Sequence, residues 1–120
     1  MNPEGSQPGR SLNFDLIVTI VNRGFAEDVV EATRRGGAEG GTIVLGRGTG
    51  IREQKKILGI PIEPEKELVL TVVPEDRTQR VLEEIRRSLD LDAPGRGIGF
   101  VVPLKMVVGI SHLLNGQGQG

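Results

Sequence analysis

Four segments of this 120-residue chain are expected to be strands, and their apolar side chains point to both sides. In NFDLIVTIV, residues 13–21, Leu16, Val18 and Ile20 alternate on one face. Ile17 and Val21 make the opposite face apolar as well. A strand of this kind must be covered on both sides. The fold therefore has to bury two faces of one sheet.

Two helices are expected between these strands. Residues 25–37 place Phe25, Val29, Val30 and Thr33 at helical spacing before a glycine pair. Residues 74–91 combine an acidic first turn, an apolar stripe and an i,i+4 pair of Glu83 with Arg87. Pro103 favours an edge position for the last strand, because proline cannot donate to a sheet ladder. The expected strands are 13–21, 41–46, 66–73 and 98–104.

The order of these elements is βαββαβ, which predicts a ferredoxin-like α+β fold. Its four-stranded antiparallel sheet carries two helices on one face, so the second face is left bare. Because no third helix remains to cover it, self-association is the economical solution. The alternative is that the second face holds only scattered exposed apolar residues.

Composition limits the function classes. The length fits one domain, here residues 13–112 between flexible tails 1–12 and 113–120. The net charge of -1 gives no basic field for nucleic acid or an anionic membrane, and no apolar stretch is long enough to insert into one. We expect a cytoplasmic protein. Cysteine is absent and His112 is the single histidine, so no metal cofactor is predicted.

Two similar glycine-arginine pentads stand far apart in the sequence, GRGTG at 46–50 and GRGIG at 95–99. Glycines let backbone N–H groups approach an anion, and arginine offers forked donors to phosphate or carboxylate. Antiparallel topology puts the pentads at opposite sides of the sheet, but the 17-residue loop 48–64 could reach across its end or into a neighbouring subunit. We predict one anion site built from two loops. The alternative is a pair of ordinary glycine turns with solvated arginines.

The runs GGTIVLGRGTG, ELVLTVVPED and PGRGIGFVVPLKMVVGI resemble the P-II family of nitrogen-regulatory signalling proteins. The resemblance implies a homotrimer with its sheets facing inward, adenine nucleotides between subunits, and a long T-loop that touches a regulated protein. It implies nucleotide contacts at Ile20, Gly40, Gly41, Thr42, Arg47, Gly48, Thr49, Gly50, Gly95, Arg96, Gly97 and Ile98. Among these, it places Gly40, Gly41 and Thr42 beside the adenine of the neighbouring chain. It implies partner contacts at Arg52, Lys55, Lys56, Ile57, Leu58 and Ile60.

The chain also departs from that family. Ile98 stands where the family has a phosphate-binding lysine, and Gly109 and Ser111 stand where it has basic residues. Fewer cations favour fewer phosphates, so we expect ADP or AMP to bind at least as tightly as ATP. Some such side branches resemble regulators of membrane transport, which makes a transporter one class of partner by analogy.

Two other functions fit the same order of elements. An acylphosphatase-like enzyme needs an anion-cradling loop after the first strand and a catalytic Asn on another strand, but NRGFAED offers one arginine and no evident Asn partner. A trimeric metal-binding protein of the ion-tolerance type would have to use carboxylates. We expect a sensor rather than an enzyme.

Overall fold

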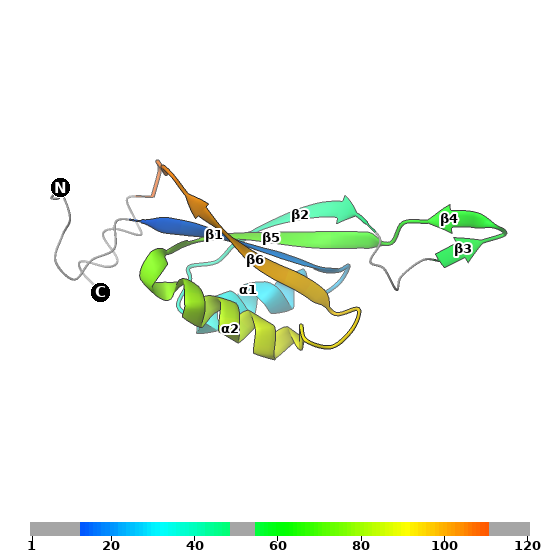
Figure 1. Ribbon diagram of the computed structural model, residues 1–120, viewed down its shortest axis with the longest axis horizontal. Helices are drawn as coiled ribbons and strands as arrows, with labels where there is room; N and C mark the ends of the chain where they lie inside the picture. The colour runs from blue at the N-terminus through cyan, green and yellow to red at the C-terminus, as the bar shows by residue number, and fades with distance from the viewer. Residues whose placement is uncertain (1–12, 49–54, 111–120) are drawn as a thin grey trace, which may run out of the picture.

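The computed structural model describes residues 13–48 and 55–110, so the expected tails 1–12 and 113–120 lie outside the described residues. The elements are β1 (Phe14–Asn22), α1 (Ala26–Arg35), β2 (Thr42–Arg47), β3 (Lys55–Ile57), β4 (Ile60–Ile62), β5 (Glu65–Pro74), a 3-10 turn η1 (Glu75–Arg77), α2 (Thr78–Leu89) and β6 (Gly97–Leu104). Four strands form one antiparallel sheet in the order β2-β5-β1-β6, and both helices lie on one face of it (Figure 1). The ferredoxin-like prediction is confirmed.

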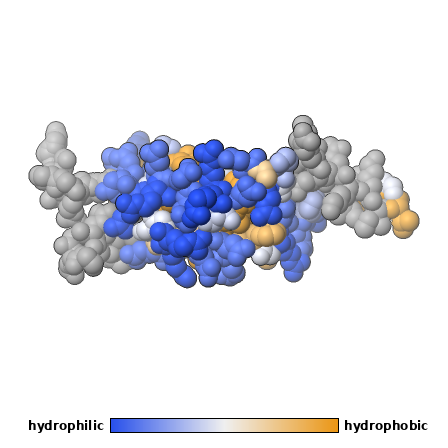
Figure 2. All heavy atoms as spheres, turned by 90° about the horizontal axis from the view of Figure 1, so that it is seen from below, coloured by the Kyte–Doolittle hydropathy of each residue, from blue (hydrophilic) through white to orange (hydrophobic). Residues whose placement is uncertain are grey.

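The hydrophobic core lies between the helices and one face of the sheet. Ile17 and Val21 of β1 are nearly fully buried there, as is Val69 of β5. The helices bury their predicted apolar residues against this face, including Val29 of α1 and Ile85 of α2. The outward side of the helical layer is largely hydrophilic (Figure 2). This distribution follows from the helical spacing of the apolar residues.

The opposite face of the sheet remains open in the single chain. Val18 of β1 lies opposite both Leu70 of β5 and Phe100 of β6 in the strand register, so an apolar row crosses the sheet. Phe100 is 43% exposed and Ile98 is 57% exposed. Together with Val44 and Val102, which are also exposed, they make this face apolar. We call it the open face, and it is the second apolar face that the strand pattern predicted.

Two smaller expectations concerned the edge position of the last strand and the ion pair on the second helix. β6, with Pro103, is an edge strand as predicted. The ion pairs of α2 differ from the predicted pair of Glu83 with Arg87, because Glu83 contacts Arg86 while Arg87 contacts Glu84. Both observed pairs are spaced i,i+3, a spacing that also brings two side chains together on a helix surface.

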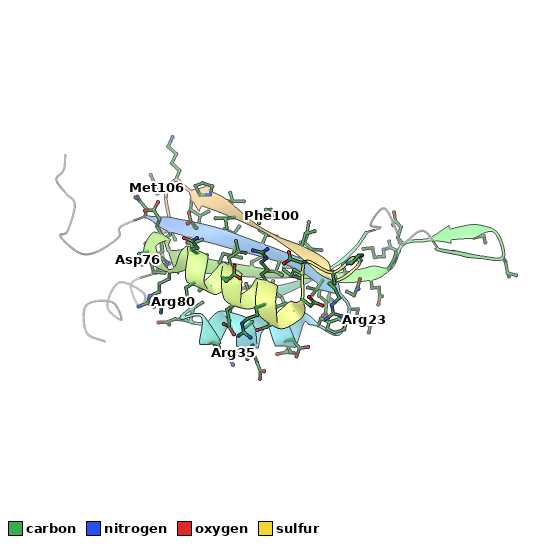
Figure 3. The ribbon with its side chains drawn as sticks, turned by 60° about the horizontal axis from the view of Figure 1, so that its bottom comes forward. Arg23, Arg35, Asp76, Arg80, Phe100 and Met106 are labelled. Carbon is green, nitrogen blue, oxygen red and sulfur yellow. The ribbon has the colours of Figure 1, made fainter. Side chains whose placement is uncertain are left out.

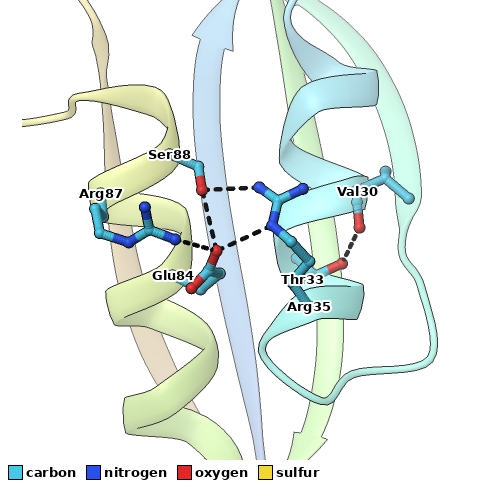
Figure 4. Close-up of polar contacts among 6 residues, drawn as sticks. All are labelled: Val30, Thr33, Arg35, Glu84, Arg87 and Ser88. Carbon is cyan, nitrogen blue, oxygen red and sulfur yellow. Dashed lines mark hydrogen bonds and ion pairs between the residues drawn. The ribbon is translucent and has the colours of Figure 1, made fainter.

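A small polar cluster ties the two helices together. Glu84 of α2 accepts hydrogen bonds from Arg87 at 2.5 Å and from Arg35 of α1 at 3.0 Å (Figure 4). Arg35 also donates to Ser88 at 2.8 Å. The hydrogen bonds from Arg87 and then from Arg35 lower the pKa of the Glu84 carboxyl. The cluster lies on the helical side of the molecule.

The long loop contains regular structure that the sequence did not indicate. β3 and β4 form a two-stranded hairpin that projects beyond the end of the sheet (Figure 1). Leu58 and Gly59 at its tip have φ values of 54° and 80°. Positive φ at both turn positions is the geometry of the tightest hairpin turns, which glycine favours and leucine adopts less readily. The hairpin was missed because a leucine stands at the first of these positions.

Candidate ligand-binding site

The two glycine-arginine pentads come to the same end of the sheet, at opposite edges. β2 ends there and β6 begins there, because the two edge strands run in opposite directions. Gly46 of β2 pairs with Lys66 of β5, which in turn pairs with Asn22 of β1. Three strand spacings of about 4.8 Å separate the two edges, roughly 14 Å in all. A small ligand with an extended shape could span that distance.

A hollow of about 570 Å³ lies on the open face between the pentads. Its floor is apolar and its rim carries glycine backbone and two cations, Arg47 and Lys66. The lining residues are Ile20, Val44, Leu45, Gly46, Arg47, Gly48, Lys66, Leu68, Gly95, Gly97 and Ile98. Six of the residues expected to bind nucleotide are among them: Ile20, Arg47, Gly48, Gly95, Gly97 and Ile98. An apolar floor with a few convergent polar groups is typical of small-molecule sites.

Lys66 is the residue of this hollow that the sequence analysis did not select. Its Nζ donates to the Asn22 Oδ1 at 2.7 Å, and the Asn22 Nδ2 donates to the Gly95 carbonyl at 3.1 Å. The three residues come from β5, β1 and the turn before β6. Their proximity depends on strand register, and a strand pattern alone does not give the register.

Gly97 occupies its place because no other residue fits. Its φ is 140°, and a Cβ atom built on it would lie 2.5 Å from the Ile20 carbonyl oxygen and 3.1 Å from the Val21 Cγ1. Only glycine adopts such a backbone conformation at little cost and lets two backbones approach so closely. Gly95, with φ 77°, turns the chain toward this point. These two glycines shape the hollow at its β6 edge.

Arg96, between these glycines, turns away from the hollow. Its Nε donates to the Leu89 carbonyl at 3.1 Å, and its guanidinium lies 5.2 Å from the centre of the Phe25 ring. Both partners belong to the helical layer, because Leu89 is the last residue of α2 and Phe25 precedes α1. In the single chain Arg96 therefore ties the turn to the helices, and Arg47 is the pentad arginine that lines the hollow.

Gly40, Gly41 and Thr42 lie at the other end of β2 from Arg47. They line a separate hollow of about 330 Å³ with Glu39, Leu70, Val72 and Ile110. Five residue-to-residue steps along the strand, roughly 17 Å, separate Thr42 from Arg47. One chain therefore does not bring all the expected nucleotide contacts together. The resemblance assigned Gly40, Gly41 and Thr42 to the adenine of a neighbouring chain, and that assignment stays a prediction.

The base of the hairpin is fixed beside the hollow. The Gly48 N–H donates to the Pro64 carbonyl at 3.1 Å, which closes the base. Arg23 forms an ion pair with Glu65, the first residue of β5, and lies near the end of the sheet from which the hairpin leaves (Figure 3). Any ligand at Gly48 would therefore touch the base of the hairpin directly.

The remaining expected nucleotide contacts, Thr49 and Gly50, and the expected partner contacts divide into three groups. Thr49, Gly50 and Arg52 lie outside the described residues. Lys55, Lys56 and Ile57 form β3. Leu58 is 96% exposed and Ile60 is 64% exposed, both near the tip of the hairpin. Two apolar side chains are thus held away from the sheet.

The described parts of the chain show neither a metal centre nor a membrane span. No three His, Asp or Glu side chains gather there as metal ligands. No helix between residues 13 and 110, outside the undescribed segment 49–54, is long and apolar enough to cross a membrane.

Comparison with known proteins identifies the family. Residues 14–112 match the sequence profile described as "Nitrogen regulatory protein P-II". The chain belongs to the P-II family. This match covers the sheet, both helices, both pentads and the hairpin.

Solved structures agree on the P-II fold. A structure of B. subtilis GlnK in complex with ATP is 20% identical in sequence, with a TM-score of 0.65, and the match covers 84% of this chain and 90% of that one. A second structure of B. subtilis GlnK is 17% identical, with a TM-score of 0.61, and the match covers 82% of this chain and 90% of that one. Comparison with curated proteins gives no significant match.

Proposed function

We propose that this P-II family member is a cytoplasmic homotrimeric sensor that binds an adenine nucleotide in the clefts between its subunits. Through its β3–β4 hairpin it regulates a partner protein, for which a membrane transporter is the class that we favour. It acts by binding and not by catalysis, and it uses no metal cofactor. The observation that carries the proposal is the hollow between the two pentads, which combines an apolar floor with glycine backbone and cationic side chains.

The open face supports the trimer. Val18, Leu70 and Phe100 form an apolar row across the sheet, and around this row Phe100, Ile98 and Val102 are left exposed in the single chain. Burying such a face against copies of itself gains about 25 cal/mol for each Å² of apolar surface. The separation of Thr42 from Arg47 supports it independently, because a neighbouring chain could add its Gly40–Thr42 segment to the hollow of the first.

The chemistry of the hollow supports an adenine nucleotide. A base can lie on the apolar floor beside Ile20 and Leu68, while phosphates meet backbone N–H groups and the cations Arg47 and Lys66. The B. subtilis GlnK of similar fold was solved in complex with ATP. With one ammonium and one guanidinium at the rim, this site suits one or two phosphates, so we expect ADP or AMP to bind at least as tightly as ATP.

Calorimetric titration with ATP, ADP, AMP and cyclic AMP tests the ligand. Binding of ADP or AMP at least as tight as that of ATP is expected. Tenfold tighter binding of ATP, about 1.4 kcal/mol, would refute the preference and point to extra cations from the loop. The absence of binding by all four would refute the nucleotide site.

Two further measurements test the assembly and the response. Light scattering should give about three times the chain mass of 12.9 kDa, and a monomer at micromolar concentration would remove the basis for a site between subunits. Hydrogen exchange should show that nucleotide increases protection within residues 48–63. Equal protection with and without nucleotide would argue against a role of the hairpin in signalling.

A further inference from the structure

Lys66 and Asn22 stand side by side at the centre of the pentad end of the sheet. They are directly opposite in the β1–β5 register, on the open face. The ammonium of Lys66 is held 2.7 Å from the Asn22 Oδ1, and the same amide donates to the Gly95 carbonyl at 3.1 Å. An ammonium held by a second side chain keeps a fixed place relative to the glycine turn.

The surroundings of this ammonium favour an anion. Among the described residues that line the hollow none is acidic, and Arg47 at the β2 edge is a second cation. Ile98, which faces the hollow from β6, is apolar and contributes no charge. The side of the hollow next to the Gly95 turn therefore takes its positive charge from β5.

We propose that Lys66, positioned by Asn22, is the specificity-determining cation that contacts the phosphates of the bound nucleotide. This inference rests on the proposed nucleotide function and adds the residue that distinguishes a phosphorylated ligand from a bare nucleoside. The ammonium has three donors, so it can keep the Asn22 bond and still contact a phosphate oxygen. Asn22 contacts no ligand in this account and acts only through Lys66 and the Gly95 turn.

Binding of ADP and of adenosine tests the assignment, because the two ligands differ only in their phosphates. We expect Lys66→Met to weaken ADP binding about tenfold or more, while adenosine binding changes less than twofold. The methionine keeps a flexible unbranched stem, so the loss isolates the charge. Lys66→Arg should recover a large part of the ADP affinity, since it restores the cation.

A matched control removes an equal charge elsewhere. Lys105 is exposed and follows β6 at the opposite end of the sheet, so Lys105→Met should leave both affinities unchanged. Asn22→Ala should weaken ADP binding less than Lys66→Met does. Thermal melts of all variants identify any that are misfolded.

Each outcome has a distinct meaning. Equal ADP affinity in the wild type and Lys66→Met overturns the inference while the proposed function stands. Equal losses for ADP and adenosine in a folded Lys66→Met protein also overturn it, because they show that Lys66 only shapes the hollow. A wild type that binds neither ligand refutes the proposed function itself, and the inference fails with it.

Discussion

Substituting Gly97 by alanine probes the closest backbone approach in the site. The new Cβ would lie 2.5 Å from the Ile20 carbonyl oxygen, closer than real Cβ contacts, and the φ of 140° disfavours any side chain. A left-handed conformation costs an L-residue about 1–2 kcal/mol, and overpacking costs about 1–3 kcal/mol more. A small shift of the backbone relieves part of both costs at once, so they do not add in full. We therefore expect Gly97→Ala to lower the free energy of unfolding by about 2–4 kcal/mol.

Gly99→Ala is the matched control for this change. Gly99 lies on the same strand and face, two residues on, but its Cβ would meet the Leu82 Cδ1 at 3.4 Å, the Leu91 Cδ1 at 3.6 Å and the Val18 carbonyl oxygen at 3.9 Å, all at ordinary contact distances. Its φ is not positive. An added methyl group at ordinary contact distance, with less freedom in the unfolded chain, should change stability by less than about 1 kcal/mol in either direction.

Denaturant unfolding at one fixed protein concentration measures both variants, since an oligomer's stability depends on concentration. At about 4–8 °C for each kcal/mol, Gly97→Ala should also lower Tm by roughly 10 °C or more. We expect its ADP affinity to fall as well, because β6 must shift away from Ile20 at the edge of the hollow. Equal stabilities of the two alanine variants would refute the argument from close approach.

Three other changes test separate features of the molecule. Arg96→Ala should lower the free energy of unfolding by about 1 kcal/mol, because it removes the contact with Phe25 and the hydrogen bond to the Leu89 carbonyl. A larger effect on the free energy of ADP binding than on that of unfolding would instead place Arg96 in the site, as the sequence analysis predicted. The lowered pKa of Glu84 means that its carboxylate stabilises the fold above about pH 4.5, and that this stabilisation is lost as pH falls through the pKa in the folded protein. Glu84→Gln should therefore lose less stability than the wild type when the pH is lowered, and denaturant unfolding of both proteins from pH 6 to 3 measures the difference. Phe100→Asp places a charge on the open face and should give a smaller assembly by light scattering, whereas an unchanged mass would mean that this face is not the interface.

The main elements could be predicted from the sequence because their local signals agreed. The alternation on two faces of β1 and β5 and the apolar stripe of α2 each fit one type of element. The order of elements then restricted the topology to very few choices. The apolar open face followed from the same alternation.

The details of the site depend on register and on side-chain direction, which local signals do not give. The sequence predicted Lys66 only as the first residue of a strand. Its pairing with Asn22, which the sequence pattern does not give, places it beside the Gly95 turn. Arg96 matched a family position, but its own neighbours Phe25 and Leu89 take up its side chain in the single chain. The pentads were expected at opposite sides of the sheet. They do lie at its two opposite edges, but both are at the same end of the strands.

The placement of the hollow couples ligand binding to assembly. Ile20 and Ile98 line the hollow and also belong to the open face. They pair with each other two residues along the strands from the pair of Val18 and Phe100. A second chain that covers this face must therefore end beside the ligand, and a ligand touching both chains binds the assembled form more tightly than the separate ones. At a hundredfold excess over Kd, such a ligand stabilises the form that binds it by about 2.7 kcal/mol per site. Nucleotide should consequently shift the dissociation of the assembly to lower protein concentrations, and an unchanged dissociation midpoint at saturating nucleotide would place the site within one chain.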